Sequence, residues 1–326
     1  MLFGPTFPLT AALSSFFIGR GSVKLVMVTT IGSNILNILL DFLLIFGVSD
    51  VGIPALGATG AALATGAAQT VQAVLLLGVF LQRRHRETFG TTQWRFKPKL
   101  FFQNLRIGLP NSLTGIFDAM GWSVLAQILV AASAAHVTLY SIGDSFYVLF
   151  AVGFLGLQKG ITTVAANYIG ANREEILSQT LRSGIKMVLF ILIFLSIPMF
   201  FFPERLSELF LDSDSVLKLD ESLKSHVEIA MRWLWVYFMF DAISALVCGL
   251  LTAAGDTLFV MCLNVANAWL FSVIPTYLCV AYFGGSPIIT WGFWAFYGFV
   301  NALCFFLRYR YKNNKRWNTE ILQALT

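Results

Sequence analysis

Nine apolar segments follow one another along this 326-residue chain, separated by polar connections of different lengths. About 20 consecutive apolar residues are enough for an α-helix to cross the hydrocarbon core of a bilayer, and only helices or closed barrels satisfy all their backbone hydrogen bonds there. We expect spans over residues 2–18, 23–47, 57–82, 107–132, 137–168, 183–203, 229–253, 258–283 and 286–308, the first of them short. The sequence therefore predicts an all-α polytopic membrane protein with about nine transmembrane helices.

The composition excludes a soluble globular protein. Hydrophobic residues make up 57% of the chain and charged residues only 12%, whereas a soluble domain is about 25% charged. The four cysteines lie singly in apolar segments, so the sequence predicts neither a disulfide framework nor a zinc site. It contains no phosphate-binding loop and no plausible Ser–His–Asp arrangement, because the three histidines lie near segment ends. We therefore expect a protein that is not an enzyme and that has no cofactor.

Basic residues are distributed unequally between the two predicted sides of the membrane. Most of the 22 basic residues fall on one side, within residues 20–24, 83–106, 173–186 and 308–316. Because cytoplasmic loops carry an excess of Lys and Arg, we expect a multi-pass protein of the plasma (inner) membrane with a cytoplasmic C-terminus. This topology also explains the net charge of +5, so the lipid bilayer is the expected partner and nucleic acid is not. No oligomeric state is predicted.

The long basic connection at 83–106 is expected to separate two helical bundles. The predicted units are a partial N-terminal lobe over 1–82, this cytoplasmic linker over 83–106, a C-terminal lobe over 107–308 and a cytoplasmic tail over 309–326. A faint internal repeat supports two halves, because IGRGSVKLVMV at 18–28 resembles TAAGDTLFVMC at 252–262, as in transporters built from parallel repeats. The second half then has six spans and the first barely three, so we expect an N-terminally truncated chain.

Two carboxylates lie near the middle of apolar segments, where a charge costs roughly 2.5–3.5 kcal/mol even on the insertion scale. Asp118 and Asp241 have similar depths in the predicted spans 107–132 and 229–253. Two carboxylates on different helices are able to share one sodium ion or one proton, since either relieves their repulsion. We therefore predict that they bind a coupling ion. Tyr237, one turn before Asp241, is predicted either to donate to this carboxylate or bind a substrate cation, or simply to pack.

Four further polar residues are candidates for the substrate or cation pathway. Asn37 and Asp41 are four residues apart and share a helix face, where an interhelical hydrogen-bond clasp is the alternative to a cation site. Asp144 and Lys159 belong to a polar stripe along the predicted span 137–168. Lys159 is predicted either to pair with one of the central carboxylates in the absence of substrate or to extend its amine toward the interface.

Seven short motifs, in the same order along the chain, resemble the multidrug and toxic compound extrusion (MATE) family. They are GRGSVK, NILLDFLLIFG, GIPALGATGAALAT, IGLPNSLTGIFDA, VAANYIGANREE, LFLDSDSV and FDAISALVCGLLTAAGDT. The resemblance implies a multidrug efflux antiporter with two six-helix lobes around a central cleft that opens alternately inward and outward. Such a transporter exports organic cations or other amphipathic xenobiotics in exchange for sodium ions or protons, and the resemblance does not choose between the two ions.

The resemblance also implies roles for individual residues. Asp118 and Asp241 fall on the family's ion-coupling carboxylates, Asp118 where the family commonly has Glu, and Tyr237 falls on the aromatic residue one turn before the second acid. Asn37 and Asp41 fall on the polar pair of the first lobe.

Two departures from the family pattern leave alternatives open. Lys159 stands where the family usually has a small residue, and the chain is expected to lack the first three helices and part of the fourth, so that the first-lobe cation site is incomplete. The alternatives to an exporter are a flippase for lipid-linked saccharides and a non-transporting remnant.

Overall fold

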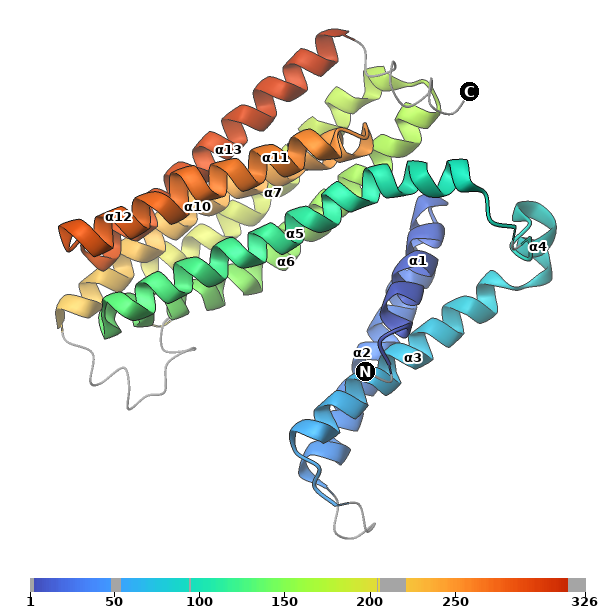
Figure 1. The fold of residues 1–326 in the computed structure, drawn as a ribbon, viewed down its shortest axis with the longest axis horizontal. Coiled ribbons are helices and arrows are strands. Elements are labelled where there is room, and N and C mark those ends of the chain that lie inside the picture. Colours follow the sequence, from blue (N-terminus) through green and yellow to red (C-terminus); the bar gives the residue numbers. More distant parts are fainter. Residues whose placement is uncertain (1–2, 48–53, 94, 204, 206–220, 316–326) are drawn as a thin grey trace. The chain divides into compact units, whose positions relative to one another are not determined.

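The computed structural model describes residues 3–47, 54–93, 95–203, 205 and 221–315. Eight helical spans in this part of the chain are long and apolar enough to cross a membrane, which confirms the predicted all-α membrane architecture (Figure 1). The first predicted segment, 2–18, corresponds to the shorter helix α1, Thr6–Gly19. The motif LFLDSDSV and most of the predicted tail lie outside the described residues.

The chain divides into two compact units, residues 1–97 and 98–326. The first unit contains α1, α2 (Val23–Phe46), α3 (Ala58–Phe80) and the short basic helix α4 (Arg83–Phe89). Helix α3 packs against both α1 and α2. Ser33 of α2 donates to the Ala68 carbonyl of α3 at 2.8 Å, and Gln72 of α3 donates to Thr30 at 2.8 Å. Polar side chains therefore join these two helices, as is common between helices in a membrane.

The second unit is a bundle of long helices. They are α5 (Pro98–Ala132), α6 (Ala134–Gly170), α7 (Leu177–Phe201), α10 (Glu221–Ala253), α11 (Thr257–Ala268), α12 (Ile274–Phe283) and α13 (Pro287–Lys315). Helix α10 packs against α6, α7 and α13, and its Leu234, Phe238 and Ala242 are fully buried. A Cβ atom at Gly249 would lie 2.9 Å from the Gln158 carbonyl oxygen of α6, so glycine is needed for the close approach of these two helices.

The predicted span 258–283 is not one continuous α-helix. A π-helical segment, Trp269–Val273, separates α11 from α12, and Pro275 lies in the first turn of α12. Proline has no N–H to donate to the carbonyl four residues earlier and its ring crowds that carbonyl, so a locally widened turn relieves the crowding. Such π segments occur often at functional sites, and this one directly follows the polar residues Asn264 and Asn267 of α11.

Helix α13 continues seven residues beyond the predicted end of its span at 308. Arg308 donates to Asp256 through Nε at 2.8 Å and through a second guanidinium nitrogen at 3.3 Å. The Lys312 amine lies 3.5 Å from the same carboxylate, and the Arg308 guanidinium lies over the Phe259 ring at 4.4 Å. Helix α13 extends here because its basic residues pair with the turn between α10 and α11. Likewise, α5 begins at Pro98, so part of the predicted linker 83–106 is helical.

Candidate cation and substrate site

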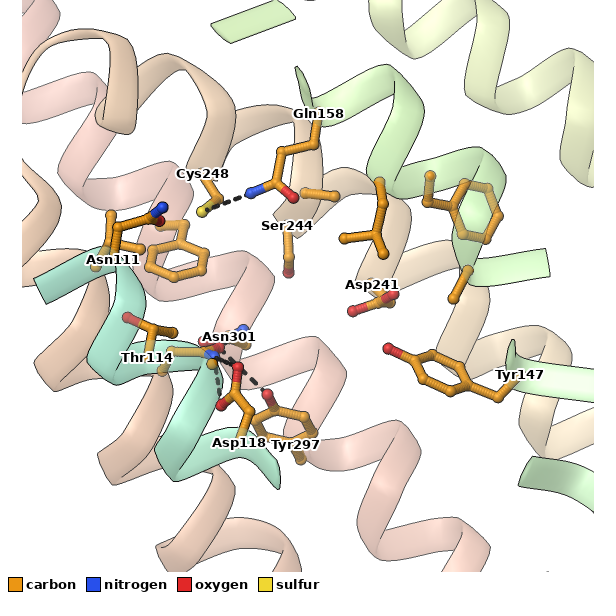
Figure 2. A pocket seen from close by; sticks show the side chains of 18 of the residues that line it. Asn111, Thr114, Asp118, Tyr147, Gln158, Asp241, Ser244, Cys248, Tyr297 and Asn301 are labelled. Atoms are coloured by element: carbon orange, nitrogen blue, oxygen red, sulfur yellow. Dashed lines mark hydrogen bonds between the residues drawn. The ribbon is translucent and has the colours of Figure 1, made fainter. Parts of the chain in front are cut away.

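A cavity of about 360 Å³ lies inside the second unit, between α5, α6, α10, α11 and α13 (Figure 2). Its polar lining includes Asn111, Thr114, Asp118, Tyr147, Gln158, Lys159, Tyr237, Asp241, Ser244, Cys248, Asn264, Tyr297 and Asn301. Trp122 and Phe154 add aromatic surface. This volume falls within the range of about 300–1,000 Å³ that is typical of small-molecule pockets.

Asp118 is held by a chain of amide side chains. The Asn264 Nδ2 atom of α11 donates to both carboxylate oxygens of Asp118, at 2.9 and 3.0 Å. The Asn264 Oδ1 atom accepts from Asn301 Nδ2 at 2.9 Å and from the Tyr297 hydroxyl at 3.3 Å, both on α13. Asn267 in turn donates to Asn301 Oδ1 at 3.1 Å. The amide of Asn264 is thereby fixed with its donor group toward the carboxylate.

Asp241 projects from α10 into the same cavity and has different neighbours. The phenol of Tyr237, one turn earlier on α10, is in polar contact with the Asp241 carboxylate and with Tyr147 of α6. Figure 2 shows the Tyr147 hydroxyl directed toward Asp241. Ser244, one turn after Asp241, is only 4% exposed, and its hydroxyl has no hydrogen-bond partner among the described residues. The two carboxylates thus face one cavity from different helices and in different surroundings.

The structure brings four of the predicted site residues together. Asp118, Tyr237, Asp241 and Lys159 all line the cavity. Lys159 is exposed, and the ion pairs found among the described residues do not include it. Asp144 is half-buried on α6 and does not belong to the cavity lining.

Asn37 and Asp41 lie on α2 of the first unit. The Asn37 Nδ2 atom of α2 donates to Thr65 Oγ1 of α3 at 3.4 Å, which is the kind of interhelical bond that the clasp interpretation predicts. One carboxylate oxygen of Asp41 is buried and has no partner among the described residues.

Sequence reasoning overlooked the amides of the site. Asn264, Asn267 and Asn301 are neutral, so they do not stand out in a search for ionisable residues within apolar segments. The only indication of these amides in the sequence was their spacing along the predicted helices. Asn264 and Asn267 are three residues apart, and Tyr297 and Asn301 are four apart, so each pair shares a helix face.

We expect Asn301→Leu to lower the stability of the second unit by about 1–3 kcal/mol, because it removes the buried hydrogen bond to Asn267 and one of the two bonds to the Asn264 carbonyl oxygen. The measurement is the thermal unfolding midpoint of the purified protein in detergent. Asn34→Leu, at an exposed position of α2, serves as the control and should leave the midpoint unchanged. Equal midpoints for Asn301→Leu and the unchanged chain would show that the amide chain does not stabilise the fold.

In comparisons with known proteins, the part of the chain that contains this site matches a protein family. The MatE family profile matches residues 110–278, a range that includes Asp118, Tyr237, Asp241 and Asn264. A probable multidrug resistance protein NorM of Thermotoga maritima is 28% identical over 287 residues, which cover 87% of this chain and 59% of the relative. The probable multidrug resistance protein YoeA of Bacillus subtilis is 26% identical over 304 residues, covering 92% and 63%.

Solved structures are similar in fold. A MOP superfamily transporter from Pyrococcus furiosus matches with a TM-score of 0.80 at 20% identity, over 93% of this chain and 65% of that one. A mutant of the Vibrio cholerae MATE transporter VcmN matches with a TM-score of 0.78 at 17% identity, over 94% and 66%. This chain spans about three fifths of the length of the curated relatives that it matches.

Proposed function

This chain belongs to the MatE family, and on that premise we propose that it acts in secondary active multidrug efflux, exchanging organic cations or other amphipathic compounds for sodium ions or protons. One observation carries the proposal: Asp118 of α5 and Asp241 of α10 line a single cavity within the transmembrane bundle. Acids inside a membrane are costly and commonly mark ion pathways. The cavity also presents aromatic rings, which attract organic cations.

Coupling follows from competition for the same carboxylates. A small cation that enters between Asp118 and Asp241 neutralises the charge that a cationic substrate needs, so the substrate is displaced. Such exchange drives transport only if each ligand binds the inward and outward forms with different affinity, because a ligand shifts an equilibrium by its differential affinity alone. The cavity is lined by residues from five helices. A relative movement of any of these helices changes which side chains contact the bound cation or substrate, and this provides a structural basis for different affinities in the two forms.

The charge of the cavity does not favour a lipid-linked saccharide flippase. A site for a pyrophosphate group needs an excess of basic side chains, whereas this cavity has two carboxylates against Lys159. Phosphate groups are preferentially bound by Arg, Lys and backbone N–H donors. The lining is therefore better matched to a cation than to a phosphate.

We expect vesicles that contain this chain to export ethidium, a fluorescent organic cation, when a sodium or proton gradient is imposed. A tenfold gradient of a monovalent ion supplies about 1.4 kcal/mol, enough for about tenfold substrate accumulation in one-for-one exchange. The measurement is ethidium fluorescence over time, before and after an ionophore collapses the gradient. Efflux that does not depend on either gradient would contradict the proposal. That result would favour the alternative hypothesis, in which this chain does not transport by itself.

A further inference from the structure

One end of the first unit, where α1 and α3 finish and α2 begins, is strongly basic. Helix α4 follows directly after α3 at this end (Figure 1). Four arginines lie here beside a single acid, Glu87, and they are Arg20, Arg83, Arg84 and Arg86. We propose that these arginines form a binding site for the headgroup of an anionic phospholipid. The inference concerns the first unit alone and does not depend on the proposed transport activity.

Aromatic side chains hold α4 against the end of α1. The centre of the Phe16 ring lies 4.9 Å from that of Phe80 and 5.8 Å from that of Phe89. The centres of the Phe17 and His85 rings are 5.8 Å apart. Because His85 and Phe89 are four residues apart, they share one face of α4, and the arginines occupy the rest of its surface. Helix α4 is therefore packed on the helix ends and presents its arginines from a defined position.

Arg20, in the turn between α1 and α2, belongs to the same group of residues. Its guanidinium carbon lies over the Phe89 ring at 4.1 Å and over the Phe16 ring at 5.2 Å from the ring centres. A planar guanidinium that stacks on a ring keeps its N–H groups at its edges, where they match the geometry of phosphate oxygens. Arg20 is exposed, and the ion pairs found among the described residues do not include it.

The arginines of α4 also keep donors available for a ligand. Arg83 pairs with Glu87 at 2.9 Å, but the two side chains are 93% and 66% exposed, and surface pairs of this kind contribute little. Arg86 donates to the Leu81 carbonyl through Nε alone at 2.7 Å. Arg84 takes part in none of the ion pairs found in the described part of the chain. Four arginines against one glutamate leave an excess of three positive charges.

The position of this surface favours a lipid over a free anion. Helices α2 and α3 are long and apolar enough to cross a membrane, so their ends lie near the headgroups of the bilayer. Exposed apolar side chains lie among the basic ones, since Val23 is 49% and Phe89 48% exposed. Basic and apolar side chains combined on one surface are typical of the membrane interface.

The charge of the surface favours an anionic lipid over a zwitterionic one. The headgroup of phosphatidylcholine carries its own ammonium group, which a surface with an excess of positive charge repels. Phosphatidylglycerol carries the phosphate without that ammonium group. The excess of Lys and Arg also predicts that this side is cytoplasmic, and anionic lipids give the cytoplasmic leaflet its negative surface potential.

The test counts the phospholipid molecules that bind to the purified full chain in detergent. Native mass spectrometry follows a titration with phosphatidylglycerol and, separately, with phosphatidylcholine of the same acyl chains. We expect phosphatidylglycerol to bind at least fivefold more tightly, with about fivefold for each arginine that contacts it. In the double variant Arg83→Gln, Arg84→Gln, the affinity for one phosphatidylglycerol molecule should fall about tenfold or more. Phosphatidylcholine binding should not change.

Three further variants make the result specific. Arg83→Lys combined with Arg84→Lys keeps both charges and should keep most of the affinity. Arg20→Gln removes a charge from a different element and should also weaken phosphatidylglycerol binding. Arg173→Gln is the matched control, because Arg173 is an exposed arginine of the second unit that lies 3.7 Å from an exposed glutamate, Glu175. This control should bind phosphatidylglycerol as the unchanged chain does.

Four results would overturn the inference. Phosphatidylglycerol and phosphatidylcholine could bind equally well, the double glutamine variant could keep its affinity, or Arg173→Gln could lose as much. Displacement of phosphatidylglycerol by an excess of inorganic phosphate would indicate a site for a free anion and would also contradict a lipid site. The cavity residues take no part in these measurements, so lipid binding that depends on the arginines would support the inference even in a chain that exports no ethidium.

Discussion

Asp241→Asn should abolish gradient-driven efflux while the protein still folds, and we expect the coupled rate to fall roughly 100-fold or more, as for the loss of a principal ligand in an ion site. The substitution keeps the shape of the side chain and removes its negative charge. The neutral amide of Asn attracts a cation only weakly. The variant therefore lacks the negative charge for which the coupling ion and the substrate compete. The polar contact with Tyr237 is available to the amide oxygen as well, so local packing should persist.

The measurement compares ethidium efflux from vesicles that hold equal amounts of folded protein, under the same imposed gradients. Glu228→Gln is the matched control, because Glu228 is a surface carboxylate on the same helix that only approaches Arg232 at 3.9 Å. Surface pairs of this kind contribute little, so the control should retain full efflux. If Asp241→Asn exports as fast as the unchanged chain, Asp241 is not the coupling residue and the proposed competition is wrong.

The transmembrane helices were predictable because lipid imposes a simple rule on them. A segment in hydrocarbon must be apolar and long enough to cross, so the spans follow directly from the sequence. The ends of α5 and α13 were less predictable, because basic residues were interpreted as the ends of spans. In α13 the assumption that a basic residue marks the end of a span fails, since Arg308 and Lys312 pair with Asp256, which lies some 50 residues earlier in the sequence.

The candidate site was predictable in part and for a related reason. Asp118 and Asp241 are conspicuous because an acid in an apolar segment is expensive, and the structure places both at one cavity. Asn264 is not conspicuous, because a neutral amide within a span carries a much smaller penalty. Its partnership with Asp118 joins residues 146 positions apart, which no local pattern reports. Likewise, no local pattern reports that the buried hydroxyl of Ser244 has no hydrogen-bond partner within the described part of the chain.

Gly143→Ala should destabilise the second unit by about 1–3 kcal/mol, the usual cost of overpacking a tight core. A Cβ atom at this position of α6 would overlap the indole of Trp291 on α13, and this indole is buried, with only 2% of its surface exposed. Gly153→Ala on the same helix is the matched control, because a Cβ there meets nothing within 4 Å. This control should be neutral or stabilising, since alanine favours a helix by about 0.5–1 kcal/mol over glycine.

The effect of Gly143→Ala should extend to the cavity through a row of aromatic rings that contact one another at an angle. The Trp291 ring lies 4.5 Å from Trp294, and Trp294 lies 4.9 Å from Trp122, which lines the cavity. A displaced Trp291 therefore moves the wall of the site, and ethidium efflux should fall together with the unfolding midpoint. Trp291→Leu provides space for the added methyl group, so the double variant should be more stable than the two single losses predict. Strict additivity of the two losses would show that the overlap does not determine the packing of α6 against α13.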